Sequence, residues 1–200
     1  MKKYHNKVIL TDVDGVLLNW EYAFTCWMEQ RGHKQSEDAS TKYDIAKRFT
    51  LDSRNIGFRL IKQFNESAAM GFLPALRDSM YYVKRLHEEH GYVFRCITSM
   101  SLDPNAYKLR KMNLEKLFGE SAFEDLVCLD TGADKTEALA PYKDSGLFWI
   151  EDKLENALVG LDLGLNAILI EHGYNMHDDI PEGMTKVVNW KQLYNHIIGE

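Results

Sequence analysis

Two aspartates, Asp12 and Asp14, lie two positions apart directly after a short apolar run near the N-terminus. The run at 8–11 has the composition of a β-strand, and Gly15 follows the second acid at once, which allows a sharp turn and leaves room for a ligand. Neighbouring carboxylates repel each other and add nothing to a core, so they are stable together when they share a cation or when one stays protonated. The pair therefore predicts an active site at the end of the first strand.

Other reactive side chains follow later runs of strand character. Thr98 and Ser99 come after one such run, Glu151 and Asp152 come after another, and Lys135 opens the helical pattern between them. In open α/β sheets, ligands bind outside the carboxyl ends of the parallel strands. If the first strand neighbours the strand that precedes Asp152, all these groups meet in one crevice.

Such a set of side chains suits phosphoryl transfer through a covalent aspartyl-phosphate. Asp12 would attack phosphorus, while Asp14, held protonated by its neighbours, would give a proton to the leaving oxygen and later take one from water. A carboxylate at ~4 Å from a phosphate charge is repelled by about 4 kcal/mol at an effective dielectric near 20. Mg²⁺ held by Asp12, the Asp14 carbonyl and Asp152 would remove this obstacle. Lys135 would add positive charge, and the threonine–serine pair would donate hydrogen bonds to the phosphate.

The elements that would position these groups alternate between strand and helix. Strand-like runs recur at 8–11, 92–97, 126–129, 147–150, 167–170 and 186–188. Helical patterns lie at 76–90, 105–118, 135–142, 154–163 and 190–198. The alternation indicates βαβ units, and hence an α/β fold with a mostly parallel, Rossmann-like sheet covered on both faces.

One interval is too long for a simple crossover. About eighty residues separate the first two strands, where a βαβ unit needs roughly a third as many. Helical patterns in the extra part lie near 21–31, 43–49 and 54–65. We therefore expect a core formed by residues 1–17 and 73–200, with a helical cap at 18–72 inserted after the first strand.

Composition limits the class of protein. An apolar share of 45% is ordinary for a chain with a real core, and a net charge of −6 argues against stable nucleic-acid binding. The three cysteines, Cys26, Cys96 and Cys128, have no metal-type spacing, which favours reduced thiols in a cytoplasmic protein. The apolar runs are too short to cross a bilayer, so no membrane association is expected. The oligomeric state is open, and a homodimer is one of the assemblies that the sequence allows.

Four short motifs resemble, in order, those of the haloacid dehalogenase (HAD) superfamily. They are Asp12-Val13-Asp14-Gly15-Val16, Thr98-Ser99, Lys135 and Glu151-Asp152. The aspartate at position 14 resembles the phosphatase branch, and the position of the insert resembles the subgroup with helical caps. This resemblance implies a HAD-like core, a Mg²⁺ cofactor and an aspartate nucleophile.

A narrower resemblance is to the 5′(3′)-deoxyribonucleotidases. It is carried by the opening Asp12–Trp20, by Phe72-Leu73-Pro74, by Asp134-Lys135-Thr136 and by the tail Gly173-Tyr174-Asn175. It implies that a small phosphorylated substrate, a (deoxy)nucleoside monophosphate, binds under the cap. The matching cap positions would be Trp20, Tyr43, Ile45, Phe64 and Met70. The sequence departs from the group at Glu151, where Asp is usual, and at Met100, where Pro often follows Thr-Ser.

Several alternatives stay open at this point. The substrate could be another small phosphometabolite or the phosphorylated end of a nucleic acid, and a silent binding protein could have the same fold. The threonine–serine pair could merely cap the next helix. Lys143 or Lys153 could take the role given to Lys135. Arg110 and Lys111, on the helix after Thr98-Ser99, are expected on a solvated face, and His172 could edge the site.

Overall fold

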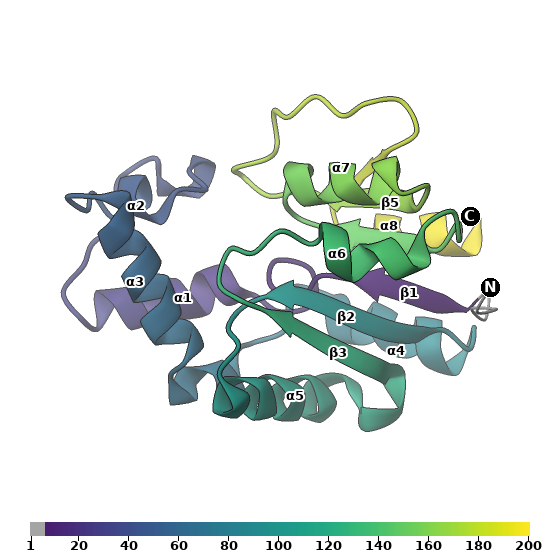
Figure 1. The fold of residues 1–200 in the computed structure, drawn as a ribbon, viewed down its shortest axis with the longest axis horizontal. Helices are drawn as coiled ribbons and strands as arrows, with labels where there is room; N and C mark the ends of the chain where they lie inside the picture. The colour runs from purple at the N-terminus through teal and green to yellow at the C-terminus, as the bar shows by residue number, and fades with distance from the viewer. Residues whose placement is uncertain (1–6) are drawn as a thin grey trace.

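Six parallel strands form the sheet of the computed structural model, which describes residues 7–200. Their order across the sheet is β3-β2-β1-β4-β5-β6 (Figure 1). The strands are β1 (Val8–Thr11), β2 (Val93–Ser99), β3 (Phe123–Leu129), β4 (Phe148–Glu151), β5 (Asn166–Ile170) and β6 (Thr185–Val187). The predicted α/β class and Rossmann-like sheet are thereby confirmed.

The strand order reverses between β1 and β4. β1 pairs with β2 on one side and with β4 on the other, and the Asp12 N–H donates to the Ile150 carbonyl at 2.9 Å. Loops at such a reversal point diverge to opposite faces and leave a crevice at the carboxyl ends of the strands. The expected neighbourhood of the first strand and the strand before Asp152 is therefore present.

Helices cover both faces of the sheet. Helices α4 (Ser79–Glu88), α5 (Pro104–Phe118) and α8 (Trp190–Ile198) share a core with Ile9, whereas α6 (Thr136–Leu139) and α7 (Leu154–Asp162) pack with Val8 and Leu10. Successive strand residues point to opposite faces, so β1 contributes to both layers and is buried on both sides. No helix within residues 7–200 is long and apolar enough to cross a membrane.

Several element boundaries differ from the predicted ones, and two of the differences have a clear physical cause. β3 begins at Phe123, before the predicted start at 126, because Glu124 and Asp125 lie on an exposed edge strand and interrupt the apolar run. The helix predicted at 135–142 ends as an α-helix at Leu139 and continues as a 3₁₀ turn, η4 (Ala140–Tyr142), with Pro141 inside it. Proline lacks the N–H that a further α-helical turn requires.

The insert after β1 is helical, as predicted. It contains α1 (Trp20–Glu29), η1 (Ala39–Thr41), α2 (Ile45–Arg48), α3 (Arg54–Asn65) and η2 (Ala68–Phe72), and α1–α3 lie beyond one end of the sheet (Figure 1). Phe24 is the centre of an aromatic cluster that continues the core on the Ile9 face of the sheet, with ring centroids 4.6 Å from Trp20, 5.3 Å from Phe64 and 5.9 Å from both Trp27 and Phe49. Aromatic packing therefore holds these short helices together.

The two chain segments that join cap and core run side by side. The Asn19 N–H donates to the Pro74 carbonyl at 2.8 Å, and the Leu76 N–H donates to the Leu17 carbonyl at 2.8 Å. Asn113 of α5 fixes the returning segment as well, because its side-chain amide bonds both the N–H and the carbonyl of Leu73.

Candidate active site

Asp12 follows β1 and is almost completely buried. Its Oδ1 accepts a hydrogen bond from the Val13 N–H at 2.7 Å, and its Oδ2 lies 2.9 Å from Nζ of Lys135. Burial raises the pKa of Asp12 to about 7, since desolvation outweighs the opposing charge of Lys135. A buried carboxylate beside a single ammonium group is therefore in place at the end of the central strand.

Lys135 lies between two carboxylates. Its side chain is 1% exposed, and Nζ lies 2.6 Å from Oε1 of Glu151. Glu151 accepts three further hydrogen bonds, from the Asn156 amide on Oε1 and from the Asp152 and Lys153 N–H groups on Oε2. Each oxygen of Glu151 already accepts two hydrogen bonds, an arrangement that suits the positioning of Lys135 better than the binding of a metal.

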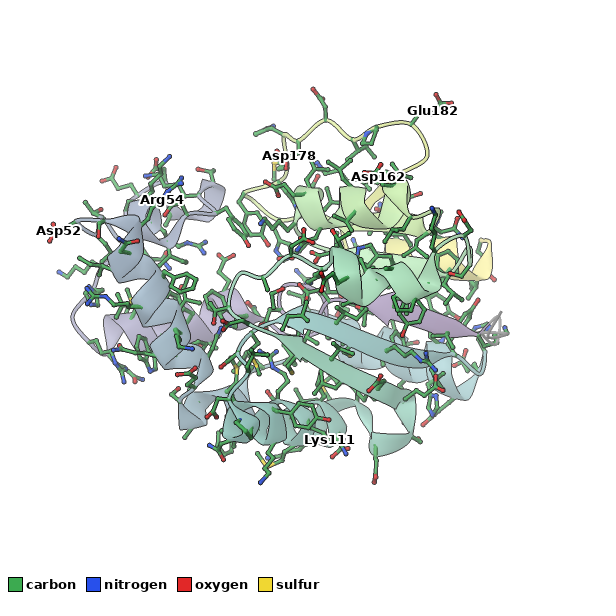
Figure 2. All side chains as sticks on the ribbon, in the orientation of Figure 1. Asp52, Arg54, Lys111, Asp162, Asp178 and Glu182 are labelled. Atoms are coloured by element: carbon green, nitrogen blue, oxygen red, sulfur yellow. The ribbon has the colours of Figure 1, made fainter. Side chains whose placement is uncertain are left out.

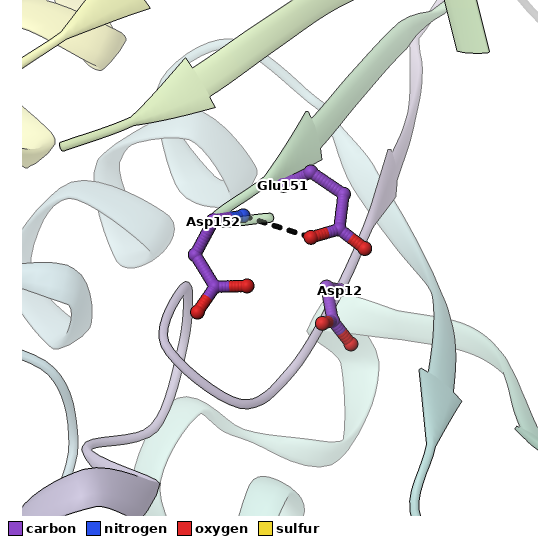
Figure 3. A group of neighbouring side chains, drawn as sticks. All are labelled: Asp12, Glu151 and Asp152. Atoms are coloured by element: carbon purple, nitrogen blue, oxygen red, sulfur yellow. Dashed lines mark hydrogen bonds between the residues drawn. The ribbon is translucent and has the colours of Figure 1, made fainter. Parts of the chain in front are cut away.

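Asp152 lies on the other side of Asp12. Figure 3 shows the side chains of Asp12, Glu151 and Asp152 turned toward one another, and each offers an oxygen within 4.8 Å of the other two. Burial, Glu151 and Asp12 all raise the pKa of Asp152, while a hydrogen bond from the Tyr174 hydroxyl opposes them. A divalent cation would relieve the mutual repulsion of these buried acids, and hard oxygen donors suit Mg²⁺. Each oxygen of Asp12 has one polar partner, and Oδ2 of Asp152 accepts from Tyr174, so both carboxylates keep lone pairs that fit such an ion.

Gly15 brings the loop after β1 against Asp152. Its φ is +76°, and a Cβ built on it would lie 2.0 Å from Oδ2 of Asp152. Only glycine allows both the backbone conformation and this close approach.

A loop after β5 supports Asp152 from behind. Asn175 donates from its side-chain amide to the carbonyls of Asp152 and Ile170, and His172 lies 2.7 Å from the Gly15 carbonyl and stacks on Tyr174. No role was predicted for Tyr174 and Asn175. The signals for them were their place in the tail that resembles the deoxyribonucleotidases and their position after a predicted strand, since such loops reach the carboxyl edge of the sheet. His172 does edge the site.

A cavity of about 440 Å³ opens onto these groups, between the core and the cap. Its core wall includes Asp12, Asp14, Thr98, Ser99, Lys135 and Asp152, and its cap wall includes Trp20, Tyr43, Ile45, Phe58 and Ile61. The volume lies in the range of small-molecule sites.

Comparisons with known proteins identify the fold. No protein-family model matches the chain. An uncharacterised 32.4 kDa protein of Enterobacteria phage T4 is 24% identical over 195 residues, which are 94% of this chain and 69% of that protein. A haloacid dehalogenase-like family hydrolase from Streptococcus pneumoniae aligns with a TM-score of 0.67 and 13% identity, covering 96% of this chain and 98% of its own. The chain has the HAD-like fold.

A second solved structure with the HAD-like fold carries ligands. The D,D-heptose 1,7-bisphosphate phosphatase from B. bronchiseptica, complexed with magnesium and phosphate, aligns with a TM-score of 0.58 and 12% identity. The alignment covers 96% of this chain and 98% of that one. At this identity the likeness shows the fold alone, and the chemistry must be argued from the residues of this chain.

Within the HAD-like fold, several predicted residues have surroundings that the sequence did not reveal. Ser99 donates its hydroxyl to the Ala133 carbonyl at 2.8 Å, while the neighbouring Thr98 is buried and lines the cavity. Lys153 lines the cavity as well, with Nζ 5.5 Å from the Tyr43 ring, whereas Lys143 does not line it. Lys135 therefore has the central place among the three lysines.

The cap residues divide into two groups. Trp20, Tyr43 and Ile45 line the cavity, but Phe64 is completely buried in the cap core and does not line it. Trp20 lies with one face on Phe24 and donates its indole N–H to Asn65 at 2.9 Å, so only part of its ring is open to a ligand. The predicted substrate contact of Phe64 is therefore not available, because a side chain at helical spacing in a cap can equally face the cap core.

The surroundings of Asp14 differ from those predicted. Arg110 was expected on a solvated face, but its side chain is fully buried and binds both oxygens of Asp14, Nη1 to Oδ1 at 2.5 Å and Nη2 to Oδ2 at 2.9 Å. The sequence predicted no partner for Asp14, and this two-pronged contact fixes the orientation of its side chain from the α5 side. The neighbouring Lys111 lies on the outer side of α5, 54% exposed (Figure 2).

Proposed function

We propose that this protein is a Mg²⁺-dependent phosphomonoesterase that works through an aspartyl-phosphate on Asp12. The observation that carries the proposal is the buried Asp12–Lys135–Glu151 arrangement beside Asp152, at the floor of the 440 Å³ cavity. Asp12 lies beside the ammonium group of Lys135 and the carboxylate of Asp152, and this arrangement suits attack of Asp12 on phosphorus. A phosphatase with the same fold, complexed with magnesium and phosphate, supports this choice.

Three groups would hold the cation: the carboxylates of Asp12 and Asp152 and the main-chain carbonyl of Asp14. When bound, Mg²⁺ supplies positive charge that neutralises part of the phosphate and of the acidic cluster. Gly15 keeps the first loop within reach of Asp152, and Tyr174 orients the Asp152 carboxylate by its hydrogen bond. Such outer hydrogen bonds fix the direction of a ligand.

The reaction would proceed in two displacements. A carboxylate oxygen of Asp12 attacks phosphorus, the bond to the leaving oxygen breaks, and Asp14 gives its proton to that oxygen. Water then attacks phosphorus of the aspartyl-phosphate, Asp14 takes the proton of the water, and the bond to Asp12 breaks. Inorganic phosphate leaves and both carboxyl groups return to their starting state. Lys135 faces Asp12 throughout and offsets the charge that gathers on phosphate oxygens.

For the substrate, we propose a (deoxy)nucleoside monophosphate as the leading class. The cap wall offers an apolar and aromatic surface from Trp20, Tyr43, Ile45 and Phe58, on which a flat base could pack. Other small phosphometabolites and phosphorylated nucleic-acid ends are competing classes. Only the assay of a panel of substrates separates them.

The deciding experiment measures phosphate release with Mg²⁺ from nucleoside 5′- and 3′-monophosphates, sugar phosphates and a 5′-phosphorylated oligonucleotide. A 2-haloacid, assayed for halide release, tests the other chemistry that the name of the fold suggests. We expect turnover of phosphate esters and loss of more than about a thousandfold in kcat with Asp12→Asn. Release of halide but not phosphate would overturn the proposed function.

Tyr43→Ala tests the nucleotide assignment, with Tyr22→Ala as its matched control. The two tyrosines are similarly exposed, 56% and 60%, but only Tyr43 lines the cavity. Tyr43→Ala should raise KM for nucleotides and leave KM for p-nitrophenyl phosphate nearly unchanged. Equal effects on both substrates would exclude a base contact by Tyr43.

A further inference from the structure

Lys186 does not line the cavity, and the phosphatase chemistry above gives it no role. It lies on β6, and its side chain is 17% exposed. Its Nζ donates to the carbonyls of Asn175 and Met176 at 2.8 and 2.7 Å, and the carbonyl of Asp178 lies at 3.4 Å. An ammonium group has three N–H donors, so the three carbonyls match all of them.

The loop that supplies these carbonyls needs such an anchor. It runs from 171 to 184 between β5 and β6 and contains no helix or strand (Figure 1). Irregular loops of this length are uncommon in compact domains, and those present usually serve a function. Glu171, at the start of the loop, lies 3.8 Å from Nζ of Lys186 and offsets part of its charge. The lysine is thus a cation fixed to the sheet, around which the main chain of the loop folds.

The same loop holds Asp152 at two points. Tyr174 donates its hydroxyl to the Asp152 carboxylate, and Asn175 donates its side-chain amide to the Asp152 carbonyl at 2.7 Å. Asn175 therefore binds Lys186 through its main chain and Asp152 through its side chain. Loss of the ammonium group would free the Asn175 main chain, and with it the two hydrogen bonds that fix the position of Asp152.

We propose that Lys186 is a positioning residue for the cation site, which holds Tyr174 and Asn175 against Asp152 and thereby raises the affinity of the protein for Mg²⁺. The inference rests on the proposed Mg²⁺-dependent function. Hydrogen-bond partners that orient a metal ligand are worth about tenfold to a hundredfold in metal affinity. Because Lys186 acts through the main chain of such a partner, its effect belongs at the lower end of this range.

The test measures the Kd of the full chain for Mg²⁺ by calorimetric titration, without substrate. Lys186→Met keeps the apolar stem of the side chain and removes the ammonium group, and we expect it to raise the Kd about tenfold. Lys186→Arg keeps the positive charge and the donors, so it should bind Mg²⁺ more tightly than Lys186→Met. Lys186→Gln keeps a donor without the charge, should raise the Kd as well, and carries the test if Lys186→Met does not fold.

Lys191→Met is the matched control, because Lys191 is an exposed lysine of α8 and its replacement should leave the Kd unchanged. The free energy of unfolding without Mg²⁺ is measured for each variant by urea denaturation. A lysine with a structural role alone would lower this free energy and leave the Kd of the folded protein at its wild-type value. That result, or equal Kd values for Lys186→Arg and Lys186→Met, would overturn the positioning role.

The same titrations separate this inference from the proposed function. A wild type that binds no Mg²⁺ would overturn the Mg²⁺-dependent function, and the inference with it. A wild type that binds Mg²⁺ and releases phosphate from esters, beside a folded Lys186→Met variant of unchanged Kd, would overturn the role of Lys186 alone.

Discussion

The ammonium nitrogen of Lys135 lies 2.6 Å from Oε1 of Glu151, in a pair that is completely buried. Both oxygens of Glu151 accept hydrogen bonds. Burial raises the pKa of Glu151, but the charge of Lys135 and hydrogen bonds from Lys135 and the neighbouring N–H groups outweigh burial and hold the pKa below its usual value. Glu151 therefore fixes the position of the Lys135 ammonium group.

Replacing Glu151 by Gln tests this relationship. The amide presents a donor where Glu151 now accepts two bonds, so we expect a loss of about 3–5 kcal/mol in the free energy of unfolding. Phosphatase kcat should fall as well, because Lys135 loses its second anchor. Chemical denaturation and steady-state kinetics measure the two effects. Glu182→Gln, on an exposed loop (Figure 2), is the control, and an equally stable Glu151→Gln would contradict the positioning role.

Gly15→Ala should damage the site without damaging the core. Its Cβ would lie 2.0 Å from Oδ2 of Asp152, and its φ of +76° disfavours any side chain. Gly32→Ala separates the effect of backbone strain from the effect of the contact with Asp152, because Gly32 has a φ of +85° and nothing within 4 Å of its added Cβ. Both variants should lose about 1 kcal/mol of stability from backbone strain, and only Gly15→Ala should lose activity. Retained activity in Gly15→Ala would mean that Asp152 does not need its present position.

Binding of Mg²⁺ should be visible in the thermal stability of the wild type. A ligand present at a hundred times its Kd adds about 2.7 kcal/mol to the stability of the form that binds it. We expect Mg²⁺ to raise Tm by roughly 5–10 °C, EDTA to reverse the rise, and Asp152→Asn to abolish it. In the absence of Mg²⁺, Asp152→Asn should be at least as stable as wild type, since a destabilised buried charge has been removed. A Tm rise that survives in Asp152→Asn would exclude this residue as a ligand.

His172 should make the folded state less stable in mild acid. Burial lowers its pKa below the usual 6.5, although Gly15, Glu21 and Glu171 oppose the shift. The unfolded chain therefore binds the proton more readily, and the free energy of unfolding falls as pH drops below about 6.5. Urea denaturation between pH 5 and 8 should show a shallower dependence in His172→Gln than in wild type. His177→Gln, at an exposed position of the same loop, should keep the wild-type slope.

Much of the fold was predictable because local patterns agreed with the global arrangement. The apolar run before Asp12 and the apolar run before Glu151 both read as buried strands, and the rule that parallel sheets bind ligands at a reversal point brought their acids together. Arg110 was not predictable in the same way. It lies next to Lys111 on α5, and only the rotation of that helix against the sheet decides which of the two cations is buried.

The cap was harder to interpret for a related reason. Phe64 and Tyr43 are both aromatic residues of the cap, yet Phe64 lies in α3 and is buried within the cap, whereas Tyr43 lies in the irregular segment before α2 and lines the cavity. Side-chain type and spacing do not determine that choice without the packing partners.

The buried ion pairs of the site have a consequence for its overall charge. Its ionisable groups are Asp12, Asp14, Glu151 and Asp152 on one side and Lys135 and Arg110 on the other. With all of them ionised, the acids exceed the bases by two charges, which one divalent cation neutralises. The pKa values of Asp12 and Asp152 are both raised, so these two acids take up protons more readily than usual when the cation is absent. Binding of the cation should therefore release protons to the buffer, and the affinity of the protein for the cation should depend on pH.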